Sequence, residues 1–215
     1  SEYYTKIDLV SAYQQMLLEE ESSKLSTLST HKGLFQPLRL MFEVASAPAI
    51  FQREIEKIMQ DLEMVVCYLD DILIGGHNWS EHIPLVREVL KRLEDAGLTV
   101  NAKKCLFFQK QLKFSGFLIN KEGITSDPSK VDAIVRCARP FDCKSLEKFL
   151  GFVTFLIRFI PQASTILKPL YELLDENKSF NWTKECEETF LQVKQMVKTS
   201  NFLSHFDPNK EVFIK

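Results

Sequence analysis

Two adjacent aspartates, Asp70 and Asp71, lie between two strongly apolar segments, and this arrangement constrains the fold more than any other feature. Residues 65–68 read Val-Val-Cys-Tyr, and residues 72–74 read Ile-Leu-Ile. Apolar, β-branched runs on both sides of a brief polar break predict a β-hairpin with the acids at its tip. Two adjacent acids at such a position usually mark only a solvent-exposed turn without a chemical role. Neither neighbour at this tip is the Gly or Asn that tight hairpin turns prefer, which favours a chemical role for the pair.

Asp8 is a candidate third acid, because it follows the β-prone residues 3–7 where the apolar pattern breaks. An aspartate in this position is more often a helix cap. Carboxylates that lie close together repel one another, and bound divalent cations relieve the repulsion. Together Asp8, Asp70 and Asp71 could hold two Mg²⁺ (or Mn²⁺) ions about 4 Å apart. That arrangement activates an attacking 3′-hydroxyl and stabilises departing pyrophosphate.

The first part of the chain mixes strand and helix patterns. Strands are expected at 3–7, 25–28, 34–42, 98–100, 106–109 and 112–119, with a hairpin at 64–74. A helix capped by Ser46, with Pro48 in its first turn, extends to about residue 62. A second helix opens at Ser80 and ends at Gly97. This order predicts an α+β fold in which helices cover one face of an antiparallel sheet.

From Pro128 onward helical patterns dominate, at about 128–137, 145–160, 164–174 and 183–199. The apolar residues of the 145–160 helix nearly encircle it, so most of them are expected in the core. A short strand is expected at 211–215. We therefore predict a domain boundary near residue 125.

Composition supplies few constraints on partners. The chain has 27 basic and 29 acidic residues, for a net charge of −2, whereas nucleic-acid-binding proteins usually carry a basic face. Local clustering of basic residues, and not the net charge of the chain, decides whether a protein binds nucleic acid. The five cysteines include no Cys-x-x-Cys pair, which indicates a reducing compartment rather than disulfides or a zinc site. The chain has neither a membrane-length apolar run nor a secretion signal at residues 1–6, so we expect no membrane partner.

A set of short motifs carries a family resemblance. Residues 6–15 read Lys-Ile-Asp-Leu-Val-Ser-Ala-Tyr-Gln-Gln, residues 47–52 read Ala-Pro-Ala-Ile-Phe-Gln, and residues 68–73 read Tyr-Leu-Asp-Asp-Ile-Leu. Further matches are Asn-Ala-Lys-Lys-Cys at 101–105, Phe-Ser-Gly-Phe at 114–117, Phe-Leu-Gly at 149–151 and Arg-Phe-Ile-Pro at 158–161. In order and approximate spacing the set resembles the reverse transcriptase in the polyprotein of a gypsy-type LTR retrotransposon. The resemblance covers nearly the whole chain.

This resemblance implies a palm with a remnant of the fingers at 1–125 and a helical thumb at 126–179. A connection and the first strand of a truncated RNase H-like domain would follow at 180–215. The implied activity is that of an RNA-directed DNA polymerase, a nucleotidyltransferase that adds deoxynucleotides to a primer 3′-OH with two Mg²⁺ or Mn²⁺ ions. Asp8, Asp70 and Asp71 match the metal-binding carboxylates, and the carbonyl of Leu9 would assist them. Lys104 matches a lysine proposed to protonate pyrophosphate, although a solvated loop lysine is the alternative.

The resemblance also implies how substrates bind. Tyr13 would block a ribose 2′-hydroxyl, although a packed aromatic on a short helix is the alternative. The nucleotide pocket would further include Phe42, Glu43, Pro48 and Gln52. Phe114, Ser115, Gly116 and Phe117 would form the primer grip. Lys144, Lys148 and Arg158 are the expected contacts to nucleic-acid phosphates.

One departure from the family pattern affects the expected activity. Residues 40–43 read Leu-Met-Phe-Glu, where family members commonly have Leu-Pro-Phe-Gly. Glu43 adds bulk and negative charge where a glycine permits close approach of the backbone, so we expect lowered activity. A decayed or domesticated palm that binds nucleic acid without catalysis is the second hypothesis. An unrelated α+β domain with an acidic turn is the third.

The expected partners are a primed RNA or DNA template, deoxynucleoside triphosphates and the rest of a Gag-Pol-like polyprotein. That polyprotein would supply upstream fingers strands and a protease before this segment, and an RNase H and an integrase after it. The expected location is intracellular, in the cytoplasm or a virus-like particle.

Overall fold

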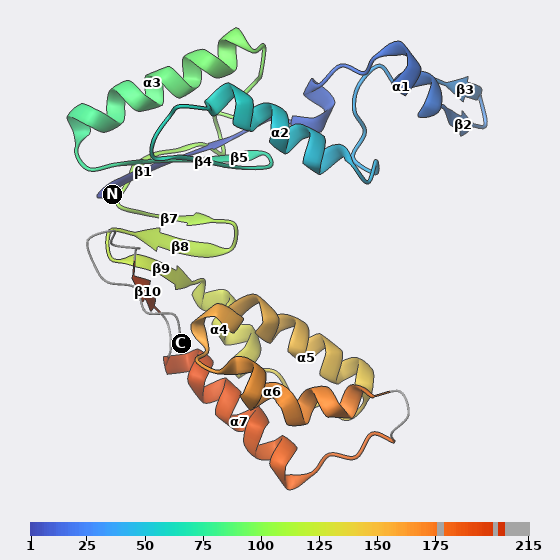
Figure 1. Cartoon of the computed structure of the whole chain (residues 1–215), viewed down its shortest axis with the longest axis vertical. Helices are drawn as coiled ribbons and strands as arrows, with labels where there is room; N and C mark the ends of the chain where they lie inside the picture. The colour runs from blue at the N-terminus through green and yellow to red at the C-terminus, as the bar shows by residue number, and fades with distance from the viewer. Residues whose placement is uncertain (176–178, 200–201, 205–215) are drawn as a thin grey trace. The chain divides into compact units, whose positions relative to one another are not determined.

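The computed structural model describes residues 1–175 and 179–199, and the backbone of 202–204. The chain forms two compact units, Ser1–Ser115 and Gly116–Lys215 (Figure 1). The division lies upstream of the boundary expected after residue 125. The reason is that Phe117 packs in the same core as the helices that follow it.

The first unit contains a four-stranded antiparallel sheet of order β4-β5-β1-β6. Its strands are β1 (Tyr3–Asp8), β4 (Val65–Tyr68), β5 (Asp71–Gly76) and β6 (Leu106–Gln109). The predicted hairpin with the acids at its tip is confirmed, since β4 pairs with β5 and the turn falls between Tyr68 and Asp71. A further strand, β7 (Gln111–Phe114), follows β6.

Two helices, α2 (Ala47–Met59) and α3 (Trp79–Asp95), lie on one face of this sheet (Figure 1). Their apolar faces and the strands share one core, which includes Ile7, Phe51, Ile55, Ile72, Ile74, Val89 and Leu93. The expected start of α3 was wrong: Asn78, not Ser80, caps the helix by accepting a hydrogen bond from the N–H of Glu81. Ser46 precedes α2 as expected, but its side chain makes no capping hydrogen bond.

The segment between β1 and α2 differs most from expectation. It forms the 3₁₀ helix η1 (Ala12–Gln15), the helix α1 (Glu20–Leu25) and a small hairpin of β2 (Leu28–Thr30) and β3 (Gly33–Phe35). The strands expected at 25–28 and 34–42 are therefore largely wrong. The Glu20–Lys24 ion pair supports α1. Leu25 is 90% exposed, so the apolar residues that suggested a strand do not contribute to a core.

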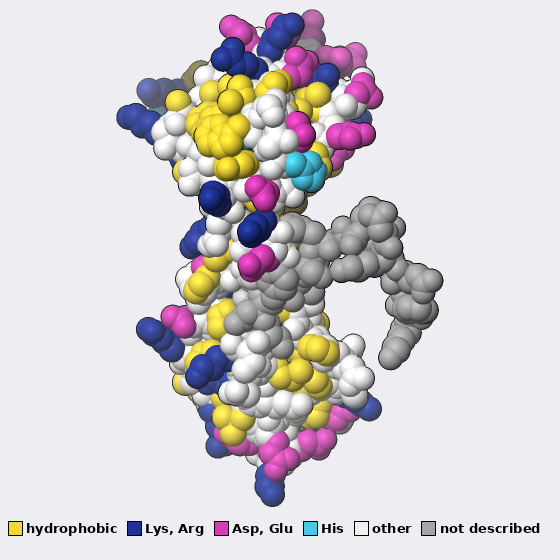
Figure 2. Space-filling view, turned by 90° about the vertical axis from the view of Figure 1, so that its left-hand side faces the viewer, with side chains coloured by type: hydrophobic (Ala, Val, Ile, Leu, Met, Phe, Trp, Pro, Cys, Tyr) yellow, Lys and Arg dark blue, Asp and Glu magenta, His cyan; other side chains and the backbone are white. Residues whose placement is uncertain are grey.

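Aromatic rings gather where β1 and α3 begin. The Trp79 ring stacks on Phe108 at 4.9 Å between centroids and lies 5.2 Å from Tyr3, with 48% of the tryptophan exposed. Figure 2 views this side of the first unit and shows a patch of hydrophobic side chains there. His82 is buried beneath Phe108 and shares a 2.8 Å hydrogen bond with the hydroxyl of Thr5. This cluster lies at the opposite end of β1 from Asp8.

The second unit begins with an antiparallel arrangement of β8 (Phe117–Asn120), β9 (Gly123–Ser126) and β10 (Phe202–Ser204). The single strand expected at 112–119 is interrupted because Ser115 and Gly116 adopt positive φ values of 47° and 81°. The turn expected at 120–123 is present, and the side chain of Asn120 accepts hydrogen bonds from the N–H groups of Glu122 and Gly123. The strand expected at 211–215 lies outside the described residues.

Four helices complete the second unit: α4 (Pro128–Val135), α5 (Cys143–Leu156), α6 (Ala163–Tyr171) and α7 (Lys184–Thr199). The 3₁₀ turns η2 (Ile157–Phe159) and η3 (Glu172–Leu174) extend α5 and α6. Asp142 starts α5 with a capping box that includes Ser145. The core contains Leu146, Phe149, Val153, Leu167, Leu170, Phe190 and Val193. Because α7 contributes to this core, the described part of 180–215 is not a separate compact unit.

Among the helices that the structure describes, none is both long enough and apolar enough to cross a bilayer.

Candidate active site

Asp8 and Asp71 are brought together by the register of the sheet. They are direct partners at the end of the antiparallel pair of β1 and β5, and directly opposed residues project to the same face of such a pair. The N–H of Leu9 donates a 2.9 Å hydrogen bond to the carbonyl of Asp70. The end of β1 is therefore tied to the tip of the hairpin that carries the other two acids.

The carboxylate of Asp71 lies within electrostatic reach of both Asp70 and Asp8. Burial raises the pKa of Asp71, and the negative charges of Asp70 and Asp8 raise it further. The ammonium of Lys6 acts in the opposite direction, with its Nζ 2.8 Å from Oδ2 of Asp71. Carboxylate charge is thus present at this end of the sheet and is partly offset by Lys6.

Over the described parts of the chain, no three His, Cys, Asp or Glu side chains lie close enough together to hold an ion. However, Oδ1 of Asp8 is buried and has no hydrogen-bond partner, and the Nζ of Lys104 lies 3.7 Å away. A buried carboxylate oxygen that has an ion pair but no hydrogen bond is incompletely satisfied, and a closely bound cation would satisfy it. The carboxylates are oxygen donors of the kind that divalent cations take, and in this structure Lys6 pairs with Asp71 and Lys104 with Asp8.

Tyr13 lies beside the acidic hairpin. Burial raises the pKa of its phenol, and the charge of Asp70 raises it further. Its ring centroid lies 5.3 Å from Phe42 and 5.6 Å from Phe51. Tyr13 and Phe42, both predicted in the nucleotide pocket, are therefore neighbours, and Phe42 is 54% exposed.

The other predicted pocket residues lie near the start of α2. Glu43 is exposed and follows Phe42, and Pro48 lies in the first turn of the helix. Gln52, one turn further along α2, makes hydrogen bonds that the sequence did not suggest. Its side chain is hydrogen-bonded to the backbone of the acidic hairpin, at Cys67 and Leu69.

The predicted primer grip spans the boundary between the two units, so its halves are described separately. In the first unit Phe114 is buried at the end of β7. In the second unit Phe117 stacks on Phe155 at 4.7 Å between centroids, and the Arg158 guanidinium lies 4.6 Å from the centroid of the Phe117 ring. Arg158 is thus adjacent to one half of the predicted grip.

The remaining predicted phosphate contacts, Lys144 and Lys148, are exposed on α5.

Two neighbours of the predicted residues were missed by sequence reasoning. Lys6 was not singled out, although residues two apart on a strand share a face, and that spacing from Asp8 was a usable signal. Phe155 belongs to the 145–160 helix, whose apolar residues were expected mostly in the core. Its ring covers both Phe117 and the position where Gly116 lacks a side chain. No sequence pattern pairs Phe155 with Gly116, because their contact is tertiary.

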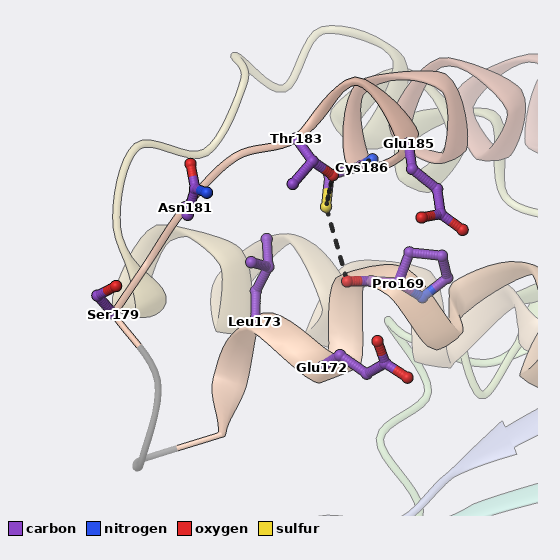
Figure 3. Close-up of a pocket in the computed structure, with 8 residues that line it drawn as sticks. All are labelled: Pro169, Glu172, Leu173, Ser179, Asn181, Thr183, Glu185 and Cys186. Carbon is purple, nitrogen blue, oxygen red and sulfur yellow. Dashed lines mark hydrogen bonds between the residues drawn. The ribbon is translucent and has the colours of Figure 1, made fainter.

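A cavity of about 530 Å³ lies between α6 and the start of α7 in the second unit (Figure 3). The Sγ of Cys186 donates to the carbonyl of Pro169 at 3.7 Å beside it, and Glu172 and Glu185 are among its lining residues. No residue predicted from the sequence to bind substrate or metal lines this cavity.

Comparison with known proteins decides the family. Residues 1–119 match the sequence profile of the family described as reverse transcriptase (RNA-dependent DNA polymerase). The chain belongs to the reverse transcriptase family. Members of this family generally use divalent metal ions. The expected membership, the α+β palm fold and the retrotransposon resemblance are confirmed.

The relatives of this reverse transcriptase segment include transposon polyproteins. The chain is 34% identical over 217 residues to the Transposon Tf2-3 and Tf2-7 polyproteins of Schizosaccharomyces pombe (strain 972). These alignments cover 100% of this chain but only 16% of each polyprotein. The segment therefore corresponds to a small part of the relatives that it matches.

Solved reverse transcriptases share its fold. The foamy viral protease-reverse transcriptase in complex with an RNA/DNA hybrid superimposes with a TM-score of 0.85 at 25% identity, covering 94% of this chain and 28% of that one. The foamy viral protease-reverse transcriptase dRH in complex with ds DNA gives a TM-score of 0.88 at 25% identity, covering 97% and 37%.

Proposed function

We propose that this reverse transcriptase segment is the palm and thumb of an RNA-directed DNA polymerase that adds deoxynucleotides to a primer 3′-OH. The observation that carries the proposal is the pairing of Asp8 with Asp71 in register, with Asp70 tied to the end of β1 through Leu9. This geometry supports a shared role for acids that are far apart in the sequence.

In this proposal Asp8, Asp70 and Asp71, assisted by the carbonyl of Leu9, hold two Mg²⁺ or Mn²⁺ ions. Such ions, when bound, activate an attacking hydroxyl and stabilise the charge that develops on pyrophosphate. The buried Oδ1 of Asp8, which lacks a hydrogen bond, supports the assignment.

Two lysines have separate roles in the proposal. Lys6 offsets the charge of Asp71, whose pKa is raised by burial, and so helps to keep this carboxylate ionised. Lys104, close to Asp8, is positioned as a candidate to donate a proton to pyrophosphate.

The substrate contacts follow from the same assignment. Tyr13, with Phe42 beside it, is proposed to exclude a ribose 2′-hydroxyl. Glu43, Pro48 and Gln52 complete the surroundings of the nucleotide pocket. The residues proposed to contact nucleic acid are Phe114, Ser115, Gly116 and Phe117 for the primer, and Lys144, Lys148 and Arg158 for phosphates.

The proposed partners are a primed RNA or DNA template and deoxynucleoside triphosphates. Complexes of the foamy viral relatives with an RNA/DNA hybrid and with ds DNA support this proposal. A protease, an RNase H and an integrase in the same polyprotein are proposed from the family resemblance. The match to only 16% of each transposon polyprotein is consistent with such a larger protein. The intracellular location expected from the sequence stays a prediction.

Primer extension tests the proposed function. The full 215-residue chain is incubated with a primed poly-riboadenylate template, thymidine triphosphate and Mg²⁺ or Mn²⁺. We expect extension that Asp70→Asn abolishes. Binding of the primed template without extension would instead favour a non-catalytic remnant, the reading that Glu43 in place of the usual glycine motivates.

A further inference from the structure

We propose that Gln52 is a positioning residue, which fixes the backbone of the β4–β5 turn and so orients Asp70 and Asp71. The inference rests on the proposed function of the two acids. It also differs from the expectation that Gln52 contacts the nucleotide.

The amide of Gln52 joins α2 to the end of β4 and to the first residue of the turn. Its Nε2 donates to the carbonyl of Cys67 at 2.9 Å, and its Oε1 accepts from the N–H of Leu69 at 2.8 Å. Nε2 also donates to Oε1 of Glu56, one helical turn along, at 2.6 Å. Two acceptors face the nitrogen and one donor faces the oxygen, so the orientation of the amide follows from its partners.

The turn needs such support because of the backbone at Leu69. This residue has φ +54°, a left-handed conformation that β-carbons disfavour. The hydrogen bond to Gln52 holds the Leu69 N–H in that conformation. One residue later, the carbonyl of Asp70 accepts the N–H of Leu9. Asp70 is therefore held from both sides, by α2 through Gln52 and by the end of β1.

The same hydrogen bonds leave Gln52 little capacity for a substrate. A side-chain amide has two donor hydrogens, and both are used, one on Cys67 and one on Glu56. One lone pair of Oε1 is used on Leu69. A nucleotide phosphate needs a donor, which Gln52 could offer only by releasing the turn or Glu56.

Mn²⁺ affinity and amide exchange, both measured without nucleotide, test the inference. Electron paramagnetic resonance titration gives the Mn²⁺ dissociation constant, and hydrogen exchange reports the Leu69 amide. We expect Gln52→Leu to raise the Mn²⁺ dissociation constant about tenfold, the scale seen when residues supporting metal ligands are removed. It should also speed exchange at Leu69. The matched control is Gln192→Leu, at an exposed glutamine on α7.

Exchanging the side chains of residues 52 and 56 provides a rescue experiment. Gln52→Glu alone places two carboxylates together and should weaken Mn²⁺ binding, whereas Gln52→Glu with Glu56→Gln restores a donor opposite an acceptor. The double variant also keeps an acceptor for the Leu69 N–H, so slow exchange at Leu69 and part of the affinity should return.

The outcomes are separable. Unchanged Mn²⁺ affinity and unchanged Leu69 exchange in Gln52→Leu, with a raised KM for the deoxynucleotide, would establish a direct nucleotide contact and overturn the inference. If the wild-type chain shows no Mn²⁺ binding that depends on Asp70, the proposed function fails instead. Leu69 exchange then still decides whether Gln52 holds the turn.

Discussion

Replacing Gly116 by alanine should destabilise the second unit by an amount that can be divided into two parts. The first part is backbone strain, because Gly116 has φ +81°, and a left-handed residue with a Cβ costs about 1–2 kcal/mol. The second is overlap, because the new Cβ would lie 2.6 Å from Cζ of Phe155. That ring stacks on Phe117 and cannot move freely. Crowding of this kind costs about 1–3 kcal/mol.

The matched control is Gly97→Ala. Gly97 has a similar φ of +69°, but a Cβ there would meet no atom within 4 Å, so only the strain of about 1–2 kcal/mol applies. Gly116→Ala should therefore lower the free energy of unfolding by about 2–5 kcal/mol, more than the control does.

Urea unfolding followed by tryptophan fluorescence measures this difference. Trp79 lies in the first unit and Trp182 in the second, so Trp79→Phe and Trp182→Phe backgrounds attribute each transition to its unit. Equal losses for Gly116→Ala and Gly97→Ala would refute the argument that Phe155 fills the space beside Gly116.

Three further predictions concern a histidine, the pocket and the helical core. Burial lowers the pKa of His82, so this imidazole binds a proton more readily in the unfolded chain than in the folded one. The free energy of unfolding should therefore fall as the pH drops below about 6.5. Urea unfolding between pH 7.5 and 5.5 should show a weaker pH dependence in His82→Gln than in the wild type. Glu43→Gly should increase primer extension, with Glu43→Gln intermediate if charge contributes, and no gain in either would show that Glu43 does not limit activity. Phe149→Ala, at a residue with 0% exposure, should cost about 3–5 kcal/mol by urea unfolding, whereas Phe152→Ala, 40% exposed on the same helix, should cost under about 1 kcal/mol.

Local patterns predicted the elements whose residues also form the cores. The acidic hairpin was recognised from two apolar runs, of which the second buries Ile72 and Ile74 in the sheet. The helices α2 and α3 were recognised from apolar spacing that matches their buried faces. The strands expected at 25–28 and 34–42 failed because many of their apolar residues, such as Leu25, Leu34 and Leu38, are exposed. Periodicity predicts structure only where a core receives the apolar face.

Individual motifs predicted which residues belong to the site, but not how those residues are arranged. Asp8, Asp70 and Asp71 could be named, but their spacing in the sequence does not give the register that places Asp8 opposite Asp71. The contacts of Gln52 with Cys67 and Leu69 join α2 to a different element. Such contacts depend on how the helix packs against the hairpin, and local sequence patterns do not reveal that packing.

The opposition of Asp8 and Asp71 also makes the chain more sensitive to deletions in β5 than to deletions elsewhere. Successive side chains on a strand point to alternate faces, so an in-frame deletion of one codon within β5 would turn its remaining residues over and expose Ile72 and Ile74. A comparable deletion within residues 25–38, where Leu25, Leu34 and Leu38 are exposed, would remove no buried side chain. The length of β5 should therefore tolerate change far less than the length of the segment that carries Leu25, Leu34 and Leu38.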